Sequence, residues 1–345
     1  MSLDTDAIDF VARERGISPA FVEKDWYATQ VIRAIADYSA SGITPIFSGG
    51  TSLSKAFGII QRFSEDLDFR GRFDTAASPN KTARRAFRHD MLNVIASPID
   101  LTLIEESIVS GSNYFKCSLT YPQAFSHVSA LRPTLLVEFS YTQPVNTPEV
   151  RSVTSMVSEY KGMPAETHIL CLSPIETAAD KLSALTWRVL KRDRKSPQDD
   201  PAMMRHLHDL YALKDSITQN QIEFAKTAQT AYDADNKTTR RALEHPLSVS
   251  VNKAAASMKA DGVYQDEYRT FVDGMSYTAD DERIQFDSAL DYFGGLASLF
   301  EGNQNTVASQ QNLSEAFTNL PFTDNSDVDF SSVMNDSPRA ADLED

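Results

Sequence analysis

Cysteine is rare in this chain of 345 residues, which contains only Cys117 and Cys171. Each lies in an apolar, strand-like run, so we expect two buried free thiols and no disulfide. The chain also lacks any run of about 18 apolar residues, which argues against a membrane-spanning helix. Its first residues have neither the basic segment nor the apolar core of a secretory signal. These absences predict a cytoplasmic protein with no membrane partner.

Several catalytic signatures are missing as well. The chain has no Gly-x-Ser-x-Gly elbow, no His-Glu-x-x-His motif and no cysteine spacing typical of a zinc site. A Walker loop (Gly-x-x-x-x-Gly-Lys-Ser/Thr) and the catalytic-loop His-Arg-Asp of protein kinases are also absent. His206 and His208 stand two positions apart on an expected helix, where they point in different directions, so we do not expect them to share a metal.

Positive charge is also in short supply, since 33 Lys and Arg face 48 Asp and Glu and the net charge is −15. This balance argues at first against a nucleic-acid partner. However, many of the acids lie in residues 301–345, where Arg339 is the only base. The bases gather in two clusters, each of which could follow a phosphate backbone or simply form a solvated helix face: Arg84, Arg85 and Arg88, and Arg188, Lys191, Arg192, Arg194 and Lys195.

A glycine pair near residue 50 has the features of an anion-binding turn. The apolar residues before it predict the end of a short buried strand, and residues 51–60 predict a helix. Glycines let the backbone approach a ligand closely, and the free N–H groups at a helix start favour an anion. Alone, such a pair is most often just a turn. Its hydroxyl and ammonium neighbours nevertheless suggest phosphate contacts from Gly49, Gly50, Thr51, Ser52 and Lys55.

Two carboxylates follow one residue apart, at Asp66 and Asp68. The strand period of two places them on one face, with Leu67 and Phe69 on the other. Mg²⁺ takes carboxylate, phosphate and water oxygens, and two such ions could hold the attacking and leaving oxygens of an in-line phosphoryl displacement. An isolated Asp-x-Asp is most often a solvated strand end. Its position one helix after the glycine turn favours a nucleotide and metal site.

These two motifs together resemble the signature of the AbiEii/AbiGii-type nucleotidyltransferases, a branch of the polymerase-β-like superfamily. The resembling segments are Gly49 to Lys55 and Arg62 to Asp68, with weaker likeness in Val22 to Tyr27, Glu176 to Leu185 and Arg205 to Tyr211. The likeness covers roughly residues 18–215. It implies a toxin of a toxin–antitoxin or abortive-infection system that acts in phage defence, uses a nucleoside triphosphate (NTP) with Mg²⁺, and is neutralised by a separately encoded antitoxin.

The resemblance gives further candidates a role. Glu138 is the only acid in the apolar run 134–140, where it is costly without a cation. It could complete the metal site, accept a proton from an attacking hydroxyl or form a structural ion pair, and the resemblance favours the metal role. By the same resemblance Lys181 reaches the triphosphate, although it could also be a snorkelling surface lysine.

Glu176 and Asp209 have simpler explanations to set beside the family roles. The sequence predicts a capping box at the start of a helix, with Ser173 as the N-cap, Pro174 at the first helical position and Glu176 as the closing acid. Arg205 and Asp209, four positions apart on a helix, could form an ion pair with each other. The resemblance instead places Asp209 in the cleft, where it orients Lys181 or the nucleotide.

The order of expected elements gives the fold class. Residues 21–38 and 79–97 predict helices, and residues 101–109, 114–121, 133–140 and 166–171 predict strands. From Ser173 to about Phe300 the chain is mostly helical. We therefore expect an α/β (α+β) fold with three parts: a nucleotidyltransferase lobe with a mixed sheet in residues 1–172, a helical lobe in residues 173–301, and a polar acidic tail in residues 302–345, which we expect to be disordered.

The expected reaction is transfer of a nucleoside monophosphate from the NTP to an acceptor hydroxyl, which by resemblance is the 3′ end of a tRNA. Two alternatives stay open. One is nucleotidylation of a protein side chain, which uses the same metal chemistry. The other is a binding module without turnover, whose acidic tail contacts partners. The sequence does not identify the preferred nucleotide, the acceptor or the antitoxin.

Overall fold

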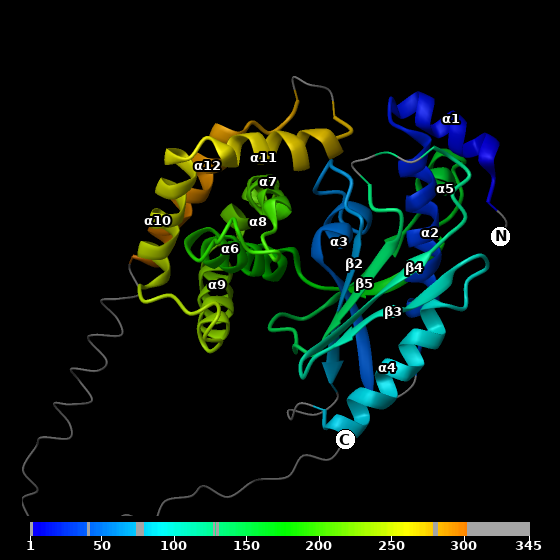
Figure 1. The fold of residues 1–345 in the computed structure, drawn as a ribbon, viewed down its shortest axis with the longest axis horizontal. Helices are drawn as coiled ribbons and strands as arrows, with labels where there is room; N and C mark the ends of the chain where they lie inside the picture. Colours follow the sequence, from blue (N-terminus) through cyan, green and yellow to red (C-terminus); the bar gives the residue numbers. More distant parts are fainter. Residues whose placement is uncertain are drawn as a thin grey trace, which may run out of the picture. The chain divides into compact units, whose positions relative to one another are not determined.

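A seven-stranded mixed sheet organises the first half of the chain in the computed structural model (Figure 1). The structure describes residues 3–39, 42–73, 79–126, 128, 131–278 and 282–301. The strand order is β3-β4-β5-β2-β1-β7-β6, in which β2 is parallel to β5 and β1 to β7, and the other neighbours are antiparallel. The strands are β1 (Ile43–Ser48), β2 (Asp66–Phe73), β3 (Thr102–Ser110), β4 (Tyr114–Thr120), β5 (Leu135–Ser140), β6 (Glu149–Val153) and β7 (Thr167–Cys171).

The two faces of the central strands differ because side chains alternate along a strand. Leu67, Phe69, Val137 and Phe139 are buried on one face, where the rings of Phe69 and Phe139 stack with centroids 5.0 Å apart. Helices α2 (Pro19–Ala36) and α4 (Lys81–Ile95) contribute to this core. The polar side chains of the same strands therefore lie on the opposite face, as the alternating sequence predicts.

Three further helices accompany the sheet. They are α1 (Thr5–Arg15), α3 (Gly49–Lys55) and α5 (Met156–Tyr160). Helix α1 packs on α2 and α5 in a small core of its own that includes Ile8, Val11 and Val157. Helix α3 directly follows β1, so that its first residues lie beside the end of that strand.

From Pro174 to Phe300 the described chain is mostly helical, and its helices gather on one side of the sheet (Figure 1). They share one core, in which α6 packs against α7, α9 and α10. The helices are α6 (Pro174–Leu190), α7 (Met204–Ala212), α8 (Lys214–Gln219), α9 (Gln221–Asn236), α10 (Leu247–Ala260), α11 (Val263–Phe271) and α12 (Phe286–Gly295), with 3₁₀ turns at Pro201–Met203, Asp273–Met275 and Leu296–Phe300.

These elements confirm the predicted α/β fold class and most of the predicted spans. The sequence missed α1, β6 and α5, and it extended the helix of residues 51–60 too far. That helix begins at Gly49 and ends at Lys55, and Gly58 then adopts a left-handed φ of 65°. Cys117 and Cys171 are buried and unpaired, as expected. In the ranges that the structure describes, no helix is long and apolar enough to cross a membrane.

The predicted division into lobes stays a prediction. The boundary at residues 172 and 173 falls between β7 and α6, and residues Met1–Glu301 form one contact unit. We call residues 3–171 the sheet part and residues 174–301 the helical part. The acidic tail of residues 302–345, predicted to be disordered, lies outside the described residues.

Candidate active site

The turn between β1 and α3 places a helix start directly against a carboxylate. Gly49 has a φ of 73°, and a Cβ built on it would lie 2.1 Å from Oδ2 of Asp68. A Cβ on Gly50 would lie 2.7 Å from Oγ of Ser64. Both positions therefore need glycine, the first for backbone conformation and space, the second for space. The result is a tight approach of the α3 backbone to the strand that carries the acids.

Three carboxylates come from two neighbouring strands. On β2, Asp66 and Asp68 share the face opposite Leu67, as predicted. The parallel register of β2 and β5 pairs Asp68 with Glu138, while the antiparallel register of β1 and β2 pairs Asp68 with Ser48. Asp68 therefore lies between the end of β1 and Glu138, at the point where the glycine turn begins.

The electrostatics of this cluster are those of unneutralised acids. Burial, reinforced by the negative charges of Asp66 and Glu138, raises the pKa of Asp68 from 3.8 to about 7. The positive charges of Lys181 and Arg205 oppose that rise. Burial also raises the pKa of Glu138, against the opposing effect of Lys116. Because the ionised forms are disfavoured, the cluster would gain from a bound cation.

The donor set suits Mg²⁺ held jointly with a nucleotide. Among the described residues, no three Asp, Glu, His or Cys side chains converge to form a metal cage. Mg²⁺, however, is usually held by one or two carboxylates together with substrate phosphates and water. Asp66 and Asp68 provide such a pair, although Oδ1 of Asp66 now accepts a hydrogen bond from Nη1 of Arg132 at 2.5 Å. The carboxylates therefore fit a magnesium–nucleotide complex better than a preformed metal site.

A buried ion cluster connects the sheet part to the helical part. Asp209 of α7 is fully buried and accepts two hydrogen bonds from Arg62, at 2.8 and 2.6 Å. It also pairs with Lys181 of α6 at 2.8 Å and with His208 at 3.0 Å. Burial by itself would raise the pKa of Asp209. The charges of Arg62 and Lys181 nevertheless hold this pKa well below its usual range. Asp209 thus fixes the ammonium of Lys181.

The alternative ion pair between Arg205 and Asp209 is not formed. Nε of Arg205 instead donates to the carbonyl oxygen of Ala202 at 3.3 Å. Arg205 therefore keeps its charge near Asp68, where it opposes the rise in pKa. The sequence could not choose between these arrangements, because the partner of Asp209 is Arg62, which lies 147 positions away.

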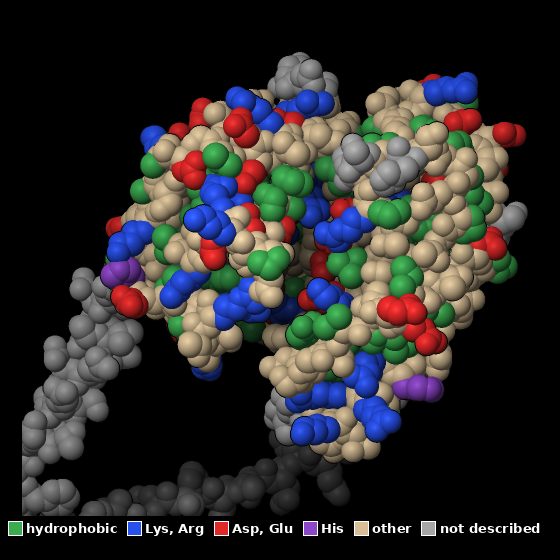
Figure 2. Space-filling model, viewed as in Figure 1, with side chains coloured by type: hydrophobic (Ala, Val, Ile, Leu, Met, Phe, Trp, Pro, Cys, Tyr) green, Lys and Arg blue, Asp and Glu red, His purple; other side chains and the backbone are tan. Residues whose placement is uncertain are grey.

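The carboxylates of the sheet part and the cations of the helical part face one another. Figure 2 shows a cleft between the two parts, with Lys and Arg side chains on both walls and acidic side chains between them. The contact between the parts continues along β2, where Arg70 pairs with Glu176 at 2.6 Å and with Asp180 of α6. A turn that favours anions, paired carboxylates and an opposing lysine are the parts that transfer of a nucleotide group requires.

Comparison with known families agrees with this geometry. The sequence profile of the AbiEii nucleotidyl transferase toxins of type IV toxin–antitoxin systems matches residues 33–292. The chain belongs to this family. It is therefore a nucleotidyltransferase toxin, for which an NTP substrate and an antitoxin partner follow from the family. The resemblance seen in the sequence is confirmed.

Two further comparisons add less. Among solved structures, the chain is similar to MenT4, a nucleotidyltransferase toxin from Mycobacterium tuberculosis H37Rv. The identity is 14%, the match covers 87% of this chain and 99% of that chain, and the TM-score is 0.40. Comparison with curated protein sequences gives no match.

The predicted phosphate ligands of this AbiEii-family toxin divide into two groups. Gly49 and Gly50 lie at the turn beside Asp68. Lys55 is instead paired with Asp25 at 2.5 Å and lines a cavity of about 300 Å³ whose lining does not include Asp66, Asp68 or Glu138. Thr51 donates its hydroxyl to the carbonyl oxygen of Asp66 at 2.5 Å, and Ser52 is buried. Phosphate contacts from all five residues, those of the glycine pair included, stay a prediction.

Two residues at the site were given no role from the sequence. Arg132 belongs to the loop before β5 and contacts Asp66, and Arg62 precedes β2 and binds Asp209. Arg62 stands within the family-like segment, so that its position was a usable signal, whereas Arg132 lies in a loop without a motif.

The predicted capping box is half correct. Oγ of Ser173 caps α6 by accepting a hydrogen bond from N–H of Ile175, but the carboxylate of Glu176 does not bond to Ser173. It accepts hydrogen bonds from the backbone N–H groups of Val145 and Asn146 and pairs with Arg70. A partly buried arginine and two backbone N–H groups therefore compete successfully with the local cap, and Glu176 anchors α6 to the sheet.

Proposed function

We propose that this toxin uses Mg²⁺ to transfer a nucleoside monophosphate from an NTP to the 3′ end of a tRNA. The observation that carries the proposal is the position of Asp68, which lies between the glycine turn and Glu138 and within reach of the charge of Lys181. Phosphates need N–H donors and cations, the metal needs carboxylates, and this cleft supplies all of them.

Each residue has one role in the proposed reaction. The N–H groups at Gly49 and Gly50 face the phosphates, and Asp66 and Asp68 hold the metal. When bound, Mg²⁺ neutralises negative charge on the phosphates. Lys181 stabilises the charge that develops on the departing pyrophosphate. Asp209 keeps that ammonium in place without contacting the substrate itself.

We assign Glu138 the role of accepting the proton of the attacking hydroxyl. A carboxylate with a raised pKa is a better proton acceptor than one at the ordinary value. Its raised pKa and its register beside Asp68 support this role. The predicted metal role of Glu138 remains the alternative.

The biological consequence follows from the acceptor. A nucleotide added to the 3′ end of a tRNA blocks attachment of an amino acid, so translation and growth stop until the antitoxin intervenes. We propose that this happens in the cytoplasm and that it serves defence against phage by abortive infection. Family membership supports the toxin role, and the tRNA is the finer part of the proposal.

The test is to incubate the purified protein with each α-labelled NTP, total cellular RNA and Mg²⁺, and to separate RNA from protein. We expect label in the tRNA fraction, and none when Asp68→Asn replaces the wild type. Label found in protein alone would show that the acceptor is a protein and not a tRNA. Growth inhibition that persists in Asp66→Ala and Asp68→Ala variants would show a binding module without turnover.

A further inference from the structure

Helix α6 carries a second feature beyond Lys181, at its C-terminal end. The guanidinium groups of Arg188 and Arg241 each lie 5.3 Å from the ring centroid of Trp187. Nε1 of Trp187 is buried and has no hydrogen-bond partner among the described residues. An indole ring with two guanidinium groups beside it forms a surface for planar, electron-rich groups.

This indole lines a cavity of about 510 Å³ with an excess of cations. Arg188 and Arg241 are already paired with Asp200 and Asp235. Lys191 and Arg240, which also line the cavity, are exposed and form no ion pair with any residue that the structure describes. The cavity therefore offers unpaired positive charge beside an aromatic surface, and we call it the Trp187 cavity.

The Trp187 cavity lies next to the carboxylates of the active site. Lys181 and Arg188 are seven positions apart on α6, which places them on the same helix face with a rise of about 10 Å between them. The charges of Arg188 and Arg241 also act on Glu138, where they lower a pKa that burial raises. A chain whose end reacts at Glu138 would therefore extend past Arg188 toward Trp187.

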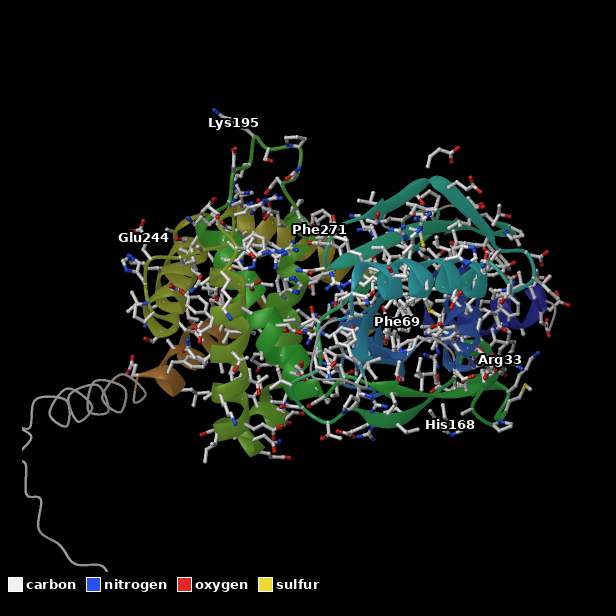
Figure 3. The ribbon with its side chains drawn as sticks, turned by 90° about the horizontal axis from the view of Figure 1, so that it is seen from below. Arg33, Phe69, His168, Lys195, Glu244 and Phe271 are labelled. Atoms are coloured by element: carbon white, nitrogen blue, oxygen red, sulfur yellow. The ribbon has the colours of Figure 1, made fainter. Side chains whose placement is uncertain are left out.

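The other basic residues of the cluster at residues 188–195 do not offer free positive charge to the Trp187 cavity. Arg192 and Arg194 are held by Glu267, and both lie over the ring of Tyr264. Lys195, at the tip of the loop after α6, points away from the protein (Figure 3). Arg192 and Arg194 are therefore held in structural ion pairs, whereas Lys195 is solvated, as the alternative for this cluster expects.

The other basic cluster lies on the opposite side of the sheet. Helix α4 packs through Phe87 on Phe139, on the face turned away from Glu138. Arg84 on that helix already donates to the carbonyl oxygens of Pro79 and Ser112. A polyanion bound there would not reach the carboxylates. Exposed Arg85 on α4 is thus a matched control for charge without access to the active site.

We propose that the Trp187 cavity binds the single-stranded end of the RNA acceptor, with one base stacked on Trp187 and backbone phosphates at Lys191 and Arg240. This inference rests on the proposed nucleotide transfer to RNA and adds the place where the acceptor is held. Stacking distinguishes RNA from an acidic protein segment, because a carboxylate has no planar ring to lie on an indole. Single-stranded RNA is recognised by such aromatic and arginine surfaces.

The test measures binding of a short, fluorescein-labelled single-stranded RNA by anisotropy across a range of salt concentrations, without NTP. We expect Trp187→Ala to weaken binding by about fivefold or more and Trp187→Phe to restore most of it, since a base still stacks on phenylalanine. Arg240→Ala should lower the salt dependence by about 0.7, the value for one phosphate contact on a single strand. The control Arg85→Ala should bind as the wild type does.

Three results of the binding assay would overturn the inference: unchanged binding in both Trp187→Ala and Arg240→Ala, an equal loss in Arg85→Ala, or displacement of the RNA by polyglutamate at equal charge. Arg240 is exposed, so its variant remains informative if Trp187→Ala does not fold. A transfer assay on the same variants separates the two proposals. Transfer to RNA that does not depend on Trp187 and Arg240 contradicts this inference alone. The opposite outcome is also possible, in which the wild type transfers no nucleotide but its RNA binding still depends on Trp187 and Arg240. That result would support this inference and contradict the proposed function.

Discussion

Gly49→Ala should remove most activity by displacing Asp68. An alanine at this position must hold a φ of 73°, which costs about 1–2 kcal/mol. Its Cβ would also lie 2.1 Å from Oδ2 and 2.9 Å from both Cβ and Cγ of Asp68, so that rotation of the carboxylate alone does not relieve the contact. Asp68 must move by roughly 1 Å. A misplacement of that size in a catalytic group costs on the order of 100-fold in rate.

Gly162→Ala is the matched control. Gly162 has a similar φ of 62°, but a Cβ there would have nothing within 4 Å. Both variants should therefore lose stability in thermal unfolding through the same backbone strain, with a further loss in Gly49→Ala from its contact with Asp68. Only Gly49→Ala should lose nucleotide transfer from a labelled NTP. Transfer by Gly49→Ala within a few-fold of the wild type would refute the argument that the turn positions Asp68. An equal loss of nucleotide transfer in Gly162→Ala would show that backbone strain, and not the displacement of Asp68, causes the effect.

Three further predictions concern charge. Asp209→Asn leaves two buried cations without their partner, so the free energy of unfolding should fall by about 3–5 kcal/mol in denaturant titrations, and an unchanged midpoint would contradict the buried cluster. Asp68 has a pKa of about 7 in the folded protein, against an ordinary value of 3.8, so between these pH values the folded state binds more protons than the unfolded state. The free energy of unfolding of the metal-free protein should therefore fall as pH rises from about 4 to about 7. The fall has an upper limit of roughly 4 kcal/mol, and it should shrink in Asp68→Asn. Arg132→Ala frees Asp66 from a half-exposed ion pair and should lower the Mg²⁺ concentration needed for half-maximal transfer by about two- to fivefold, whereas a higher requirement would show that Arg132 helps to hold the nucleotide.

Local patterns predicted the parts of the site that lie within one strand or one turn. The alternation around Asp66 and Asp68 gave the correct face, because side-chain direction in a strand depends only on the period of two. The single acid in the apolar run of β5 marked Glu138, because a carboxylate in such a run is costly without a cation. The register that places Glu138 beside Asp68 joins residues 70 positions apart, and only the folded sheet establishes it.

Long-range ion pairs account for what the sequence could not predict. Lys55 is adjacent to the glycine turn in sequence, but it pairs with Asp25 from a separate helix. Asp209 selects Arg62 over its helical neighbour Arg205, because the bidentate guanidinium satisfies both carboxylate oxygens in a buried setting. Such choices depend on which groups become buried together, and the spacing of residues along a helix does not determine that.

Attack at the α-phosphorus is the central claim, and the fate of two labels tests it most directly. RNA is incubated with the protein, Mg²⁺ and an NTP labelled either at the α-phosphate or at the γ-phosphate. Our account predicts that the α label enters the RNA and the γ label leaves as pyrophosphate, and that Asp68→Asn abolishes both. Appearance of the γ label in the RNA would contradict it.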